Sequence, residues 1–201
     1  MDQGTVVLDF NKTRNDPYNW KMIQVAIESY VCPSASYPSA RPENLGYASY
    51  RGNLGWHATV DPVTHQQLPG QTLPGVPNGI FYQNSQVNLR DVTDGTTQTF
   101  LFGESQLGPY WGDCASCCSY ANDEHPLPAA NARITITPIN FDLPHWRTAN
   151  NKYYSFGSFH SDVVNFTIVD GSVHTIAKNI DSAMFRYLCT RNGREAITIS
   201  F

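Results

Sequence analysis

The chain has 201 residues, which suits one domain, and its 41% hydrophobic content is enough for a core. A net charge of −4 and the absence of a basic run argue against nucleic acid and anionic membrane surfaces as partners. Only 15% of residues are charged, with 14 glycines and 13 prolines, which is typical of a loop-rich, exported, partly β protein rather than a cytosolic helical enzyme.

The first predicted element is a helix. Asp16 suits its N-cap and Pro17 its first helical position. Apolar side chains recur at helical spacing over 20–30, and the pair Cys32-Pro33 is expected to end the helix.

Two long stretches, 33–88 and 104–152, are rich in residues typical of turns and are expected to be loop insertions on a small sheet. Short strands are expected around 49–52 and 79–83. A further strand is expected over 97–102, after an Asp-Gly turn.

The segment 163–176 is predicted to be a β-hairpin. Its β-branched and aromatic residues flank Asp170-Gly171, a dipeptide that favours a two-residue type I′ turn. Such a turn pairs Ile168 with Val173 and places Val173 on the apolar face.

A C-terminal helix is expected after the hairpin. Asp181 suits its N-cap, apolar residues follow over 184–188, and Gly193 suits the position after its end. A last strand is expected over 196–199.

Several short motifs carry a resemblance to a known family. In order, they are Val31-Cys32-Pro33-Ser34, Tyr47 to Asn53, Asn78 to Phe81, Val92 to Thr99, Gly103-Glu104, His160 with Asp170-Gly171, and Arg191 to Glu195. Each motif is weak by itself, but their order is specific. The chain resembles the prepilin-like "H-X9-DG" family of bacterial exported proteins, which are pseudopilin-like as in type II secretion and are also grouped with bacterial solute-binding proteins.

The resemblance implies an α+β, pilin-like fold in which a helix packs on a small antiparallel sheet. Family members begin with a basic stub, a cleavage motif and a long apolar helix. This chain starts Met1-Asp2-Gln3 without such a segment. We therefore expect a single soluble domain, 1–201, without the N-terminal anchor helix of a full-length family member.

His160 and Asp170 could suggest an acid–base or metal pair. A strand over 163–169 would span ~20 Å, however, and would hold them apart. We expect structural roles instead, with Asp170-Gly171 making a turn and His160 bonding a nearby loop. A structural turn is also expected at Asp94-Gly95.

Glu104 closes a predicted strand, and a hydrogen bond to a loop or an arginine pair is favoured there over a metal. No cofactor is expected. Pilin-like subunits often use calcium to pin a loop, which makes five carboxylates conceivable calcium ligands. They are Asp91, Asp94, Glu104, Asp113 and Asp162.

The cysteines leave two alternatives open. Cys114, Cys117 and Cys118 with His125 could supply a zinc site. In an oxidising compartment the same cysteines would form disulfides, with Cys189 as a further candidate. Disulfides are favoured. Five cysteines are an odd number, so one thiol is either free or paired with a cysteine of the missing N-terminal segment. The resemblance implies that this thiol is Cys32, because the N-terminal helix region of family members often carries a cysteine.

Aromatic residues in the loops could line a binding pocket, for which Trp111, Trp146 and Tyr153 are the candidates. Filling gaps in the core is the favoured alternative. The sequence contains no established catalytic motif.

The favoured function is a non-catalytic, pilin-like structural protein of the cell envelope or extracellular space. It would act in assembly or surface recognition with other protein subunits, outside the cytoplasm. The alternative is a periplasmic solute- or carbohydrate-binding module, and a zinc-dependent hydrolase is less favoured.

Overall fold

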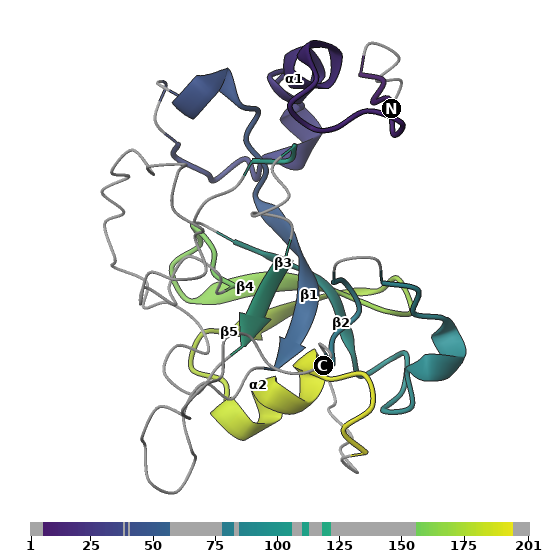
Figure 1. Cartoon of the computed structure of the whole chain (residues 1–201). Helices are drawn as coiled ribbons and strands as arrows, with labels where there is room; N and C mark the ends of the chain where they lie inside the picture. Colours follow the sequence, from purple (N-terminus) through teal and green to yellow (C-terminus); the bar gives the residue numbers. More distant parts are fainter. Residues whose placement is uncertain are drawn as a thin grey trace, which may run out of the picture.

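The computed structural model of the chain describes residues 6–37, 39, 41–56, 78–82, 85–105, 110–112, 118–121 and 156–194 (Figure 1). The helices are α1 (Pro17–Ile23) and α2 (Ser182–Cys189), with short 3-10 turns η1 (Glu28–Tyr30), η2 (Pro42–Asn44) and η3 (Leu89–Asp91). The strands are β1 (Tyr50–Trp56), β2 (Phe100–Glu104), β3 (Cys118–Ala121), β4 (Val163–Ile168) and β5 (Val173–Ala177). Within these ranges no helix has the length and apolar character that crossing a membrane requires.

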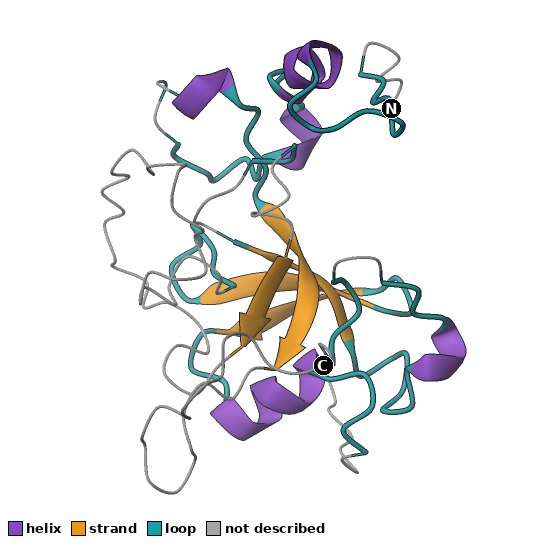
Figure 2. Ribbon diagram, viewed as in Figure 1, coloured by secondary structure: helices purple, strands orange, loops and turns teal. Residues whose placement is uncertain are grey.

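The five strands form one sheet in the order β3-β1-β2-β4-β5 (Figure 2). The pairs β1–β2, β2–β4 and β4–β5 are antiparallel, and β3 runs parallel to β1. This confirms the predicted α+β class with a small, mainly antiparallel sheet. The parallel β3 departs from the purely antiparallel sheet that was expected.

The core lies between the sheet and α2 and is built from aromatic rings. Phe100 and Phe166 stack with ring centroids 4.0 Å apart, and Phe185 of α2 lies 5.8 Å from Phe166 in a T-shaped arrangement. Phe156 is also fully buried in this cluster. Gly103 is required here, because a Cβ would lie only 2.4 Å from the Phe166 ring.

The predicted start of α1 is confirmed, and its predicted length is wrong. Asp16 accepts a hydrogen bond from the backbone N–H of Tyr18, and Pro17 begins the helix. The helix ends at Ile23 because donors from distant parts of the chain occupy two carbonyls that a longer helix would use for its own hydrogen bonds. Gly46 N–H donates to Ile23 O (3.0 Å), and the Trp111 indole donates to Val25 O (2.8 Å).

Both predicted loop insertions contribute strands to the sheet. The expected short strand at 49–52 is the start of the seven-residue β1, which lies inside the sheet, and β3 falls within 104–152. The expected strand at 79–83 is absent among its described residues, 79–82. This segment instead crosses β1, where Ile80 N–H donates to Asn53 O (2.8 Å).

The hairpin exists, but its predicted register is wrong by one residue. Val173 pairs with Thr167 rather than Ile168. Ile168 N–H donates to Ser172 O, and Gly171 has φ +90°, so the loop has three residues and ends on a left-handed glycine. The shift reverses the faces of β5, because side chains alternate along a strand: Val173 is 66% exposed and Ile176 is buried.

The predicted N-cap of α2 is confirmed, since Asp181 accepts from Met184 N–H. The helix ends at Cys189, earlier than a stop at Gly193 implies. The Asp94 carboxylate explains this end, because it accepts hydrogen bonds from the backbone N–H groups of Gly193 and Arg194, both 2.7 Å long. The expected strand over 196–199 lies outside the described residues.

Asn53 is the polar centre of the core. Its side chain is fully buried and donates to Phe100 O (2.8 Å) and Cys189 O (2.9 Å). Its side-chain oxygen accepts from Gly55 N–H (2.9 Å). One side chain thus joins β1 to the start of β2 and the end of α2.

Replacing Asn53 by alanine should lower the free energy of unfolding by about 3 kcal/mol. Three buried backbone groups would lose their partner, and each unsatisfied group costs about 1–3 kcal/mol. Urea unfolding of N53A measures this, with N11A at an exposed asparagine as control. Equal stability of the two variants would contradict the proposed role.

Replacing Gly171 by alanine should cost about 1 kcal/mol through backbone strain alone. A Cβ at this glycine meets no atom within 4 Å, so packing does not contribute. Thermal unfolding should show a smaller loss for Gly171→Asn, since asparagine tolerates left-handed conformations better. An equal loss in both variants would contradict this explanation.

Candidate functional site

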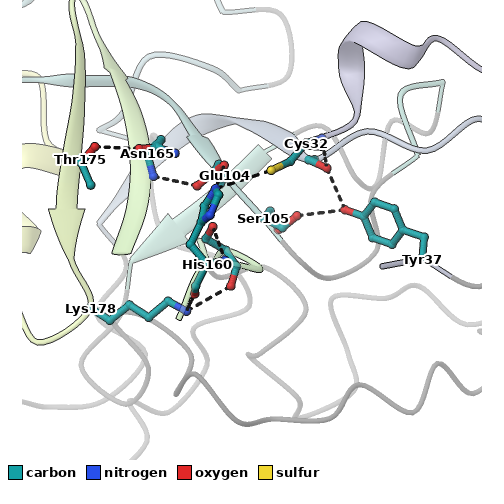
Figure 3. A network of polar contacts seen from close by, with 10 residues as sticks. Cys32, Tyr37, Glu104, Ser105, His160, Asn165, Thr175 and Lys178 are labelled. Atoms are coloured by element: carbon teal, nitrogen blue, oxygen red, sulfur yellow. Dashed lines mark hydrogen bonds and ion pairs between the residues drawn. The ribbon is translucent and has the colours of Figure 1, made fainter. Parts of the chain in front are cut away.

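Three residues that are far apart in the chain come together beside the end of β2: Cys32, Glu104 and His160 (Figure 3). Cys32 Sγ lies 3.7 Å from His160 Nε2, and Glu104 Oε1 lies 3.5 Å from the same nitrogen. The three donor atoms all lie within 4.8 Å of one another. We call these three residues the Cys–Glu–His cluster.

Glu104 is the last residue of β2, and its side chain is only 4% exposed. Its Oε2 accepts a hydrogen bond from the backbone N–H of Asn165 in β4 (2.8 Å). This bond fixes the carboxylate and leaves Oε1 directed at the His160 ring. The Glu104 carbonyl accepts from Gly157 N–H (2.8 Å), which anchors the segment leading to His160.

Cys32 follows η1 and is held by the residues around Ser49. Its backbone N–H donates to Ser49 Oγ (2.9 Å), which also contacts the Tyr37 hydroxyl (3.2 Å). Ser105, directly after Glu104, donates its N–H to Ser49 O (2.8 Å). Burial raises the pKa of Tyr37, and the Ser49 hydrogen bond only partly opposes this, so Tyr37 stays a neutral hydroxyl.

His160 lies on a short loop before β4, and Lys178 holds this loop. Its ammonium donates to the carbonyls of Ser158 (3.1 Å), His160 (2.5 Å) and Ser161 (3.3 Å). Partial burial lowers the pKa of Lys178, while the charges of nearby carboxylates oppose this shift. The His160 side chain remains 32% exposed, so solvent reaches one side of the cluster.

The arrangement differs from a catalytic relay. A nucleophile–histidine–acid triad uses both ring nitrogens, one toward the nucleophile and the other toward the acid. Here Nε2 of His160 faces both Cys32 and Glu104. The geometry suits the gathering of three donor atoms around one point, and within the described ranges this is the group that could hold a metal ion.

Residues 1–183 match the family model SBP_bac_10, whose description is a protein of unknown function, DUF1559. The chain belongs to the DUF1559 family. Neither the curated proteins nor the solved structures give a match. The cluster lies entirely within the part of the chain that matches the DUF1559 model.

His160 and Asp170 take part in separate networks in this DUF1559 domain. The Asp170 carboxylate accepts from the hydroxyl and the N–H of Ser172 (2.6 and 2.8 Å). The Ser172 hydroxyl is the main reason why the pKa of Asp170 lies below its usual value. Asp94-Gly95 forms a turn with Gly95 at φ +104°, and Asp94 also binds the chain that leaves α2.

The described calcium candidates are not assembled around Glu104, and the predicted Cys114–His125 zinc set stays untested. The cluster that contains Glu104 includes none of the other described calcium candidates, Asp91, Asp94 and Asp162. Several predicted site residues lie outside the described residues, namely Asp113, Cys114, Cys117, His125, Trp146 and Tyr153. Cys118 lies in β3, where only its backbone is described.

The structure places three further residues for which the sequence predicted a role, Cys189, Cys32 and Trp111. Cys189, a disulfide candidate, is a free thiol in the aromatic core, where burial raises its pKa. Cys32 is also a free thiol. Trp111, a pocket candidate, donates its indole N–H to Val25 O and meets Tyr30 edge-on at 6.4 Å, so it packs within the fold.

The combination of Cys32 and His160 with Glu104 was not predicted from the sequence. All three residues stand in the short motifs that carried the family resemblance. Their types, a thiol, an imidazole and a carboxylate, were a signal that could have grouped them. Nothing in the spacing of residues 32, 104 and 160 indicates that they meet.

Replacing Lys178 by methionine should lower the free energy of unfolding by about 2 kcal/mol, because three carbonyls lose a charged donor. The freed loop should also change the NMR signals of the His160 ring. Lys21→Met, at an exposed lysine of α1, is the control. Unchanged His160 signals in K178M would contradict a role of Lys178 in positioning this ring.

Proposed function

We propose that this chain is a non-catalytic, pilin-like structural domain that acts outside the cytoplasm, in the cell envelope or extracellular space. In this proposal it works by assembly with other protein subunits. The observation that carries the proposal is the character of the edge strand β5.

In the described sheet, β5 is an edge strand. Its sequence, Val-His-Thr-Ile-Ala, contains no lysine, acidic residue or proline. Soluble proteins usually protect sheet edges with such residues, because an open edge pairs with strands of other chains. An edge without this protection favours the addition of a strand from another subunit.

The outer face of the sheet next to this edge is partly apolar. Phe102 is 39% exposed and pairs with Thr167, which in turn pairs with Val173. These residues therefore share one face, opposite the core that α2 covers. Phe81 lies on the same side, with its ring 4.8 Å from that of Phe102. An apolar face beside an open edge supports packing against another subunit.

The non-catalytic part of the proposal rests on how the described polar groups are used. Asn53 bonds buried backbone groups, and Asp94 bonds the exposed backbone N–H groups of the segment that leaves α2. Glu104 fixes β4 through Asn165. These are the roles of residues that hold a fold together rather than of residues that turn over a substrate.

Sedimentation velocity over a range of concentrations tests the proposal. The wild-type chain should associate reversibly, and Val173→Lys should weaken association by placing a charge at the edge. Leu89→Lys is the matched control, because Leu89 is 68% exposed on η3, outside the sheet. A wild-type chain that stays monomeric throughout, or equal effects of both substitutions, would contradict assembly through β5.

A further inference from the structure

We propose that Cys32, Glu104 and His160 form a binding site for a divalent transition-metal ion of the zinc class, with the fourth coordination position open to solvent. This inference goes beyond the proposed function and does not depend on it. It concerns the Cys–Glu–His cluster alone and uses none of the cysteines between 114 and 118.

The distances in the cluster suit a metal ion. Zinc binds cysteine sulfur at about 2.3 Å and histidine nitrogen or carboxylate oxygen at about 2.0–2.2 Å, so tetrahedral ligand atoms lie about 3.3–3.7 Å apart. The observed separations are 3.7 Å from Cys32 Sγ to His160 Nε2 and 3.5 Å from His160 Nε2 to Glu104 Oε1. The third pair, Cys32 Sγ and the Glu104 carboxylate, lies within 4.8 Å. Side-chain rotation that brings this pair into the same range would let one ion contact all three atoms.

Direct hydrogen bonding accounts for the cluster less well. A single nitrogen, His160 Nε2, faces both the Cys32 thiol and the Glu104 carboxylate. It can accept from the thiol or donate to the carboxylate, but not both at once, because it either carries a proton or does not. The 3.5 Å contact with Glu104 is also long for a strong N–H···O bond. A bound cation would satisfy the thiolate, the imidazole and the carboxylate together.

The surroundings hold the donor atoms in place as an outer shell does in metalloproteins. The backbone N–H of Asn165 donates to the Glu104 carboxylate and orients it. The Cys32 backbone N–H donates to the Ser49 hydroxyl, which holds the Cys32 backbone in place. Lys178 holds the loop that carries His160. Groups that orient ligands before the metal arrives are a common feature of such sites.

The donor set selects the class of metal. A thiolate with an imidazole and one carboxylate suits zinc or cobalt, whereas calcium and magnesium require oxygen ligands. Three protein ligands leave one tetrahedral position for water or another ligand. The His160 side chain is 32% exposed, which gives solvent access to that position.

Cobalt(II) is a suitable probe because its absorption reports its ligands. We would titrate Co²⁺ into the purified, reduced and metal-free full chain. The proposal predicts one ion per chain, a thiolate-to-metal charge-transfer band and the intense visible bands of a tetrahedral site. Zn²⁺ should displace the cobalt and raise the melting temperature of the chain, and a chelator should reverse this rise.

Variants assign the bands to the cluster. Cys32→Ser should remove the charge-transfer band, and His160→Asn should weaken binding by more than the roughly 10- to 100-fold typical of an outer-shell change. The matched controls are His174→Asn and a triple variant in which Cys114, Cys117 and Cys118 are serine. Both controls should keep the cobalt spectrum, and circular dichroism confirms that each variant is folded.

Two results would overturn the proposal. The first is a wild-type chain without a charge-transfer band, which would leave a hydrogen-bonded cluster that takes no metal. The second is a band that survives Cys32→Ser and disappears in the triple variant, which would place the metal on the other cysteines. If either single variant fails to fold, the triple variant still decides, because its spectrum must match that of the wild type. Sedimentation results for Val173→Lys are independent of all these outcomes.

Discussion

The buried side chain of Asn53 is the interaction on which the rest of this fold depends. A primary amide can donate two hydrogen bonds and accept others. The side-chain amide of Asn53 uses these bonds to join β1, β2 and α2. Its backbone carbonyl also accepts from Ile80 and Phe81, which binds the segment that crosses β1. Each partner is a backbone group in the interior, where an unsatisfied group is costly. Substitution by a residue of similar volume could not replace this set of bonds, and packing alone would not fix the same relative positions.

Sequence reasoning succeeded where the signal was local. Asp16 and Asp181 cap their helices because the side chain, the first turn and the backbone donor are all neighbours in sequence. It failed where distant groups compete for the same atoms. The first helix stops early because Trp111 takes the carbonyl of Val25, which no window of sequence reveals. The predicted hairpin register depended on a two-residue loop. The loop has three residues and ends at Gly171, which shifts the register.

The same limit explains why the Cys–Glu–His cluster was not predicted from the sequence. Glu104 was recognised as a carboxylate at a strand end, and its bond to Asn165 needs only the adjacent strand. Cys32 and His160 reach it from segments 72 residues before and 56 residues after it in the numbering. The pairing of Tyr50 with Glu104 shows how they meet, since the start of β1 brings the Cys32 segment to the end of β2. The β1–β2 pair therefore connects the Asn53 network at one end with the Cys–Glu–His cluster at the other.

The bonds of Asn53 and Asp94 also bear on the order in which the chain can fold. Asn53 needs the carbonyl of Cys189, 136 residues later, and Asp94 needs the backbone of Arg194, 100 residues later. During synthesis, β1 and β2 leave the ribosome long before these partners exist. Contacts of such sequence separation slow folding, because a long loop must close before they form. The sheet and α2 consequently cannot close around Asn53 until the chain has been made at least as far as Cys189, and the Asp94 bonds must wait until Arg194.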